Sequence, residues 1–212
     1  TIAIASIEAI NTITDANLQA LNTLEFAGFT AVEAHTLIAT ATASSSATLS
    51  FTSGIDSTYD VYEFVFTNMH PASNGTDFQF QVNAAGASGF NETMTTTNFR
   101  AAHDEADSAT TLTYNTADDQ GQGTAYQSIG NYVGSDNDQS TSGILTLYAP
   151  SSTTYVKHFM ARSSDYMAHD QAGDYFTAGY INVTAAIDEI SFAFASGNID
   201  TGVIKMYGLA KS

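Results

Sequence analysis

Hydrophobic and polar side chains alternate along most of the chain from residue 36 onward. The clearest example is Asp77–Asn83, where Phe78, Phe80 and Val82 lie on one face and glutamine and asparagine side chains lie on the other. Tyr59–Thr67 follows the same rule, with Tyr62, Phe64 and Phe66 facing one way and Glu63 and Thr67 facing the other. A period of two is typical of a β-strand with one face in a core and one face in water.

Short segments of this kind recur to the end of the chain, separated by turns rich in Gly, Ser, Asn and Asp. The other expected strands are Thr36–Thr42, Ala47–Thr52, Thr95–Ala102, Thr111–Tyr114, Tyr126–Val133, Gly143–Ala149, Thr154–Arg162, Tyr175–Val183, Glu189–Ala195 and Gly202–Tyr207. Because no helical pattern separates them, a parallel βαβ architecture is excluded. The pattern predicts an all-β domain over residues 35–212, a two-sheet antiparallel sandwich of jelly-roll type.

The first 34 residues follow a different pattern and form a separate segment in this prediction. A short helix is expected from Ser6, and a second from Ala16 to Phe26 behind a cap at Thr14 or Asp15. Helices this short are marginal in isolation, so their apolar residues must dock on this domain or on a partner. We therefore expect residues 1–34 to be an attachment arm, with partner-binding residues Ile7, Ile10, Leu18, Leu21 and Phe26.

Composition and charge exclude several classes of function. The 212 residues include 22 Asp and Glu but only 5 Lys and Arg, a net charge of −17. Nucleic acids and anionic membrane surfaces require clustered basic residues, so neither is expected as a partner. No apolar run approaches the roughly 20 residues of a membrane-spanning helix. The absence of Cys excludes thiol catalysis and zinc–thiolate sites.

The densest group of chemically active residues is the run from His103 to Asp107. Carboxylates packed on a loop suit a hard cation, so Asp104, Glu105 and Asp107 are the candidate ligands of a structural calcium ion. A solvated acidic loop is the competing interpretation. The spacing of a zinc hydrolase is missing from this run.

Other polar groups are less specific. Asp136–Asp138 and Asp118–Asp119 are compatible with calcium loops or with ordinary turns. The five histidines are scattered, and no G-x-S-x-G elbow supports a catalytic triad. Tyrosines near polar loops are candidates for stacking on sugars, namely Tyr126, Tyr132, Tyr166, Tyr175 and Tyr180.

Three stretches together resemble a known family. They are residues 36–64, the Ala149–Ser152 turn with the strand that follows it, and the closing pair Ile187–Phe194 and Gly202–Leu209. These stretches resemble small β-sandwich virion structural or tail-fibre-like proteins of marine tailed bacteriophages. The resemblance implies a jelly-roll module on the virion exterior that is often a homotrimer, and it implies no catalytic residue.

These observations lead to three functional hypotheses. The first is a non-enzymatic virion protein, either a capsid decoration (cement) protein or a short tail-fibre-like appendage, that binds other virion proteins through its arm. The alternative is a carbohydrate-binding adhesin that recognises a host glycan. A polysaccharide-degrading enzyme, which needs two converging carboxylates, is the third.

Overall fold

The computed structural model describes residues 35–209. All the regular secondary structure within this range is β-strand. The predicted arm residues, including Ile7, Ile10, Leu18, Leu21 and Phe26, lie outside the described range. The strands are β1 (His35–Thr42), β2 (Leu49–Phe51), β3 (Val61–Pro71), β4 (Thr76–Ala84), β5 (Met94–Asp104), β6 (Thr110–Tyr114), β7 (Gly121–Gly123), β8 (Gln127–Val133), β9 (Thr141–Tyr148), β10 (Lys157–Met167), β11 (Gln171–Ile181), β12 (Ile187–Phe194) and β13 (Ile199–Leu209).

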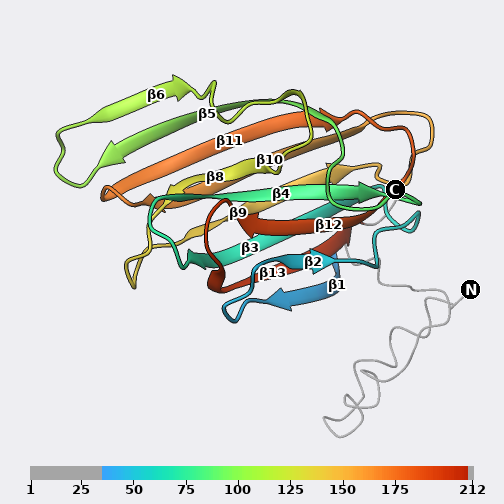
Figure 1. The fold of residues 1–212 in the computed structure, drawn as a ribbon, viewed down its shortest axis with the longest axis horizontal. Coiled ribbons are helices and arrows are strands. Elements are labelled where there is room, and N and C mark those ends of the chain that lie inside the picture. Colours follow the sequence, from blue (N-terminus) through green and yellow to red (C-terminus); the bar gives the residue numbers. More distant parts are fainter. Residues whose placement is uncertain (1–34, 210–212) are drawn as a thin grey trace, which may run out of the picture. The chain divides into compact units, whose positions relative to one another are not determined.

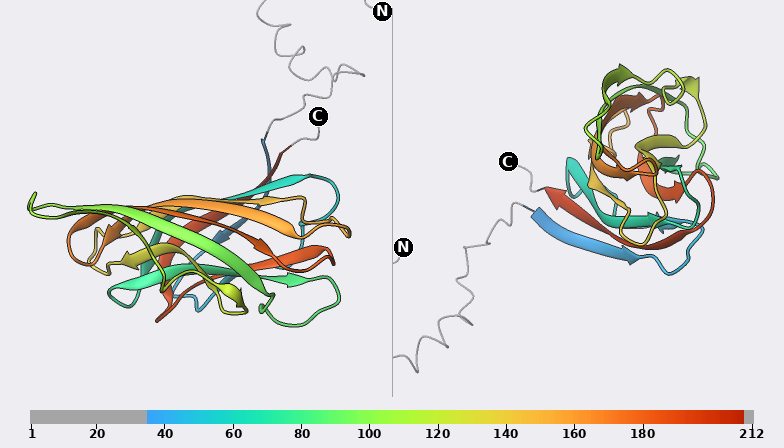
Figure 2. Two further views of the ribbon diagram at one scale, coloured as in Figure 1. Left: turned by 90° about the horizontal axis from the view of Figure 1, so that it is seen from above. Right: turned by 90° about the vertical axis from the view of Figure 1, so that its left-hand side faces the viewer.

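All strand pairs are antiparallel, and they form one continuous sheet (Figure 1). The main path runs β1-β13-β3-β9-β10-β8-β4-β12-β2, and a branch leads from β10 through β11 to β5, which pairs with β6 and β7. Its two end strands, β1 and β2, come close to each other, so the sheet is nearly closed into a barrel (Figure 2). The all-β prediction is confirmed.

The finer prediction of a jelly-roll sandwich is not confirmed by these pairings. One residue pair, Met167 with Val133, joins β10 to β8 and so connects what would otherwise be two separate sheets. The physical reason is that β10 continues beyond the expected end at Arg162 to Met167, far enough to reach β8. The predicted two layers therefore share a corner.

Aromatic side chains fill the apolar half of the interior. Phe192 of β12 lies at their centre, with ring centroids 5.7 Å from Phe64, 6.0 Å from Phe78, 6.4 Å from Phe51 and 6.5 Å from Phe80. The inward faces predicted for β3 and β4 are confirmed, because their aromatic residues all point into this core. The outer face of β4 was expected in water, but Gln81 is buried there because loops cover it and their Glu92 and Ala125 carbonyls accept from its side chain. This packing holds β12 and β4 against β3.

The interior becomes polar toward β5, β8 and β11. Inward-facing positions there carry Thr96, Asn98, Gln127, Ser128 and Thr177, all of them buried. Hydrogen bonds satisfy most of these groups, for example from the Thr96 hydroxyl to Gln127 Oε1 at 2.7 Å. The domain therefore has an apolar core at one side and a hydrogen-bonded polar interior at the other.

Lys157, at the start of β10, is a buried cation within the domain. Its Nζ donates to the carbonyl oxygens of Val183 at 3.1 Å, Thr184 at 2.9 Å and Ala185 at 2.5 Å. Burial lowers the pKa of this lysine. Lys157 holds the segment between β11 and β12 against β10, because three backbone carbonyl groups of that segment accept hydrogen bonds from this one side chain.

Candidate functional site

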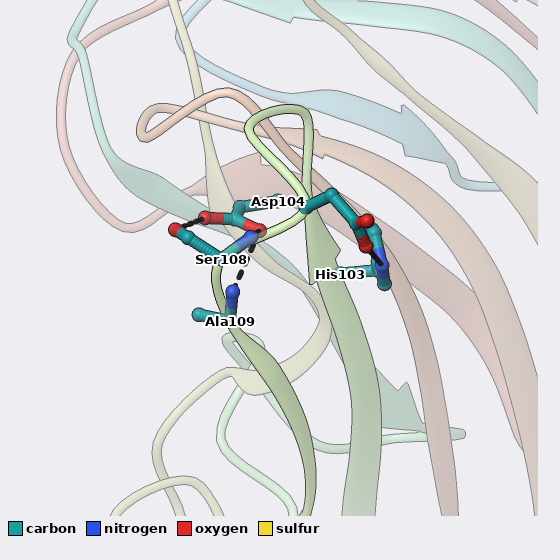
Figure 3. Close-up of polar contacts among 5 residues, drawn as sticks. His103, Asp104, Ser108 and Ala109 are labelled. Carbon is teal, nitrogen blue, oxygen red and sulfur yellow. Dashed lines mark hydrogen bonds and ion pairs between the residues drawn. The ribbon is translucent and has the colours of Figure 1, made fainter.

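The acidic run predicted as a loop forms the end of β5 and the turn into β6 (Figure 3). Asp104 Oδ1 accepts hydrogen bonds from the backbone N–H groups of Ser108 and Ala109, both at 2.8 Å, and Oδ2 accepts one from the Ser108 hydroxyl. These bonds, the Ser108 hydroxyl first, lower the pKa of Asp104 to about 2. The carboxylate therefore acts as a cap that closes the hairpin.

The three calcium candidates do not converge. While Asp104 caps the turn, Glu105 Oε1 accepts from the Tyr166 hydroxyl at 2.9 Å, and Asp107 Oδ1 lies 3.2 Å from His103 Nε2. The Glu105 contact raises the pKa of Tyr166 to about 12. Within residues 35–209 no group of three His, Asp or Glu side chains is arranged to hold a metal ion. The geometry favours an acidic turn stabilised by its own hydrogen bonds.

We expect Asp104→Ala to loosen the hairpin turn locally, because two backbone donors lose their acceptor. Hydrogen exchange of the Ser108 and Ala109 amides should accelerate roughly tenfold, the effect of losing about one ordinary hydrogen bond. Asp107→Asn is the control, since the Asp107 side chain contacts the exposed His103 ring and asparagine tolerates the positive φ of 54° at this position. Equal acceleration in both variants would contradict the capping role.

The other predicted groups are dispersed over the domain. Asp136 forms a turn with Gln139, whose N–H donates to the Asp136 carbonyl at 2.8 Å. His158 is exposed on the outer face, as its alternation predicts. His35 pairs with Glu63 at 2.9 Å, far along the sheet from the acidic turn. The two His–carboxylate contacts, His35 with Glu63 and His103 with Asp107, therefore lie at separate places in the domain.

Of the tyrosines proposed to stack on sugars, Tyr175 is buried and points inward. Its hydroxyl donates to Asp118 Oδ2 at 2.9 Å, so it cannot present a face to a ligand. Tyr132 packs against the His169 ring at 4.9 Å. Tyr126, Tyr166 and Tyr180 are partly exposed and come from different parts of the sheet. They form no common platform.

A shallow depression, which we call the outer trough, crosses the outer face of β9, β10, β11 and β5. It comprises two adjoining cavities of about 720 Å³ and 490 Å³ that share His103, Ser142, Ser164 and Ala172. The small side chains of Ser142, Ser164 and Ala172 form its floor. Cavities of this size accommodate small ligands.

A row of stacked planar groups stands beside the outer trough. Arg162, Phe176 and Phe99 occupy directly paired positions on β10, β11 and β5. The Arg162 guanidinium lies 4.6 Å from the centroid of Phe176, and the Phe176 and Phe99 rings stack at 4.8 Å. Arg162 also donates two hydrogen bonds to Asp174, at 2.9 and 2.7 Å. The distances between these stacked groups match the distance between neighbouring strands. The row of stacked side chains therefore stiffens the part of the sheet formed by β5 and β6.

The most densely hydrogen-bonded polar group was not predicted from the sequence, and it is organised by Asn131. A β-bulge in β8 sets Asn131 and Tyr132 opposite the single residue Asp77. The bulge directs two successive N–H donors to carboxylates: Asn131 N–H to Asp165 Oδ2 at 2.9 Å and Tyr132 N–H to Asp77 Oδ1 at 2.7 Å. The Asn131 amide nitrogen donates to Asp118 Oδ2 at 3.1 Å and to Asp77 Oδ1 at 3.3 Å. Its oxygen accepts from Arg100.

Burial shifts the titration of these acids. Desolvation raises the pKa of Asp165 to about 6, although Thr141 and Asn131 donate to it. Desolvation also raises the pKa of Asp77 and of Tyr175. The five residues Asp77, Arg100, Asp118, Asn131 and Asp165 are spread over 89 positions of the chain, so no local motif could have identified them.

No protein-family model, curated protein or solved structure matches this chain. Residues 35–209 contain no helix that is long and apolar enough to span a membrane.

Proposed function

We propose that this chain is a non-enzymatic structural protein on the exterior of a tailed-phage virion, as a capsid decoration protein or a short tail-fibre-like appendage. The observation that carries the proposal is the position of the stretches that resemble such proteins. β13, from the closing stretch, pairs with both β1 and β3, and β12 pairs with β2. Segments far apart in the sequence thus build one continuous part of the domain. A jelly-roll-like arrangement of two layers joined at one corner belongs to the same proposal.

The surface of the domain suits a crowded particle exterior. A net charge of −17 keeps the molecules apart in dilute salt, and at the ionic strength of seawater this repulsion is screened over a few ångströms. Within residues 35–209 most of the backbone is in hydrogen-bonded strands, which leaves short segments for a protease to attack. In this proposal the chain binds other virion proteins and copies of itself, as a homotrimer.

Deletion of residues 1–34 tests the attachment role. We expect the truncated chain to lose binding to the particle while its thermal midpoint stays within a few degrees of the full chain, because residues 35–209 contain the whole described core. Co-sedimentation with particles lacking the protein measures binding. A substitution of Leu18 and Leu21 by serine in the full chain should reproduce the loss. Normal decoration by the truncated chain would contradict the arm hypothesis.

A carbohydrate-binding adhesin is the second candidate function, and it is favoured by the cavities around β5. The outer trough, and a smaller cavity beside Arg100, present hydroxyl, carboxylate and guanidinium groups near aromatic side chains. Groups of this kind bind sugar hydroxyls through paired donors and acceptors. A glycan array probed with and without calcium tests this function, and no binding to any glycan would contradict it.

A further inference from the structure

The cavity beside Arg100 has the features of a built binding site. Its volume is about 330 Å³, and its wall is formed by Arg100 of β5, Tyr114 at the end of β6, Asn115 and Asp118 of the following loop, and Asn131 of β8. The β5–β6 hairpin, labelled in Figure 1, thus supplies one side of the cavity. A cavity of this volume lies at the lower end of the range for ligand pockets, which fits a single small molecule.

Asp118 is fixed in position and still has one oxygen without a partner. Its Oδ2 accepts three hydrogen bonds, from the Tyr175 hydroxyl at 2.9 Å and from the side-chain amides of Asn115 and Asn131, both at 3.1 Å. Its Oδ1 has no hydrogen-bond partner among residues 35–209. A carboxylate held by three donors presents its remaining oxygen with little loss of conformational freedom on binding.

Arg100 supplies the complementary donor. One terminal nitrogen of its guanidinium donates to Asn131 Oδ1, which fixes the plane of the group. Its Nε is buried and has no partner within the described residues. A buried N–H without an acceptor is costly, so it indicates an ordered water or a bound group beside Arg100.

Asn98 is a second, independent indication of a missing partner. It precedes Arg100 by two residues on the same face of β5, it is fully buried, and neither its side-chain nitrogen nor its oxygen has a partner among residues 35–209. Native interiors satisfy such groups with ordered water or a ligand. Asn98 is not among the residues that line the cavity, so an enclosed water next to the cavity is its expected partner.

The charges around the cavity determine the class of ligand. An anion attracted by Arg100 would also meet Asp118 and the nearby Asp77, and a cation would meet Arg100. A neutral polyol meets neither difficulty, because a hydroxyl can accept from Arg100 while it donates to Asp118 Oδ1. The exposed Tyr114 at the rim offers an apolar surface to the C–H groups of a sugar ring.

We propose that this cavity binds one neutral sugar unit through hydroxyl groups that contact Arg100 and Asp118. The proposal rests on the carbohydrate-binding candidate function and assigns that function to one place. Asn115, Asn131 and Tyr175 act as positioning residues, because they orient the guanidinium and the carboxylate without a need to touch the ligand.

The test is a titration of the full chain with D-glucose, D-galactose, D-mannose and N-acetyl-D-glucosamine, followed by NMR of the protein backbone. We expect at least one of these sugars to bind with a Kd on the order of 1 mM, which is ordinary for so small a ligand. Its shift changes should concentrate in residues 114–118 and 131. Arg100→Gln should weaken binding at least tenfold.

Because Arg100→Gln alters an internal network, a second variant keeps the test decisive. Ala117→Trp places a large side chain at the exposed mouth of the cavity and leaves the network intact, so it should abolish binding in a folded protein. Thr154→Trp, an exposed position in the turn before β10, is the matched control for adding a tryptophan and should bind as the wild type does. Retained binding in Ala117→Trp would overturn the proposal.

Failure of the site can be distinguished from failure of the function. If Ser164→Trp, which fills the outer trough, removes binding while Ala117→Trp does not, the Arg100 site is overturned and carbohydrate binding stands. If none of the four sugars binds but the glycan array gives a signal that Ala117→Trp retains, the same conclusion follows. If both experiments are silent, site and candidate function are overturned together, and the virion role is judged by the co-sedimentation experiment alone.

Discussion

Replacing Phe192 with alanine is expected to lower the free energy of unfolding by about 3–5 kcal/mol, the usual cost of removing a buried aromatic ring. The ring is fully buried and lies within 6.5 Å, between centroids, of four other phenylalanine rings. It therefore holds β12 against β3 and β4 at the same time. Urea unfolding monitored by circular dichroism measures the loss.

Phe99→Ala is the matched control, because it removes the same side chain from a different environment. Phe99 is 44% exposed and stacks on Phe176 at the outer face. A cost below about 1.5 kcal/mol is expected there, the value of an aromatic pair with limited burial. If the two variants lost the same stability, the placement of the apolar core around Phe192 would be wrong.

The second large effect concerns Asp165, whose carboxyl is fully buried in the polar interior. Burial raises its pKa from 3.8 to about 6, so the folded state binds its proton more tightly than the unfolded state does. The stabilising contribution of this proton is fully present below pH 4 and is lost as the pH rises through 6. The difference between the two pKa values corresponds to a change of about 3 kcal/mol in the free energy of unfolding.

Asp165→Asn isolates this contribution. The amide oxygen can still accept from the Asn131 N–H group, and the amide nitrogen can donate to the Thr141 hydroxyl. Relative to the wild type, the free energy of unfolding of the variant should therefore rise by about 2.5 kcal/mol between pH 4 and pH 7.5. Urea unfolding at a series of pH values measures both proteins.

Asp104→Asn provides a control of opposite sign. The pKa of this exposed carboxyl is lowered to about 2, so its contribution is present above pH 4 and is lost as the pH falls toward 2. The variant should lose stability relative to the wild type as the pH rises from 2 to 4, and change little above that. A flat difference for Asp165→Asn between pH 4 and 7.5 would show that the carboxyl is solvated in the folded protein.

The strands that the sequence predicts best are those whose inward positions are all apolar. The apolar faces of β3 and β4 are the predicted ones, but the opposite face of β4, predicted to lie in water, is also buried at Gln81 and Asn83. The second half of β10 escapes prediction because Ser163 and Asp165 occupy inward positions, where alternation of hydrophobicity fails. β7 escapes for another reason: Gly121–Gly123 has no pattern and becomes a strand only because β5 offers hydrogen-bonding partners.

The candidate sites divide in the same way. The acidic turn is recognisable in the sequence as a local cluster of carboxylates. The contacts of Glu105 with Tyr166 and of Asp107 with His103 are not visible there. Residue spacing alone therefore could not show whether the three carboxylates converge on a calcium ion. The cavity beside Arg100 has no local signature at all. Its parts come from β5, the loop after β6, and β8.

By itself, the sequence determined the antiparallel β class, because side-chain alternation is a property of each strand alone. It also determined the net charge of −17 and the scarcity of basic side chains, because charge is a sum over residues. Only the tertiary structure decided that the two layers join at Met167 and Val133, and that Arg100, Asp118 and Asn131 meet. Such contacts depend on register and on a β-bulge, and a shift of one residue in either would turn these side chains to the other face.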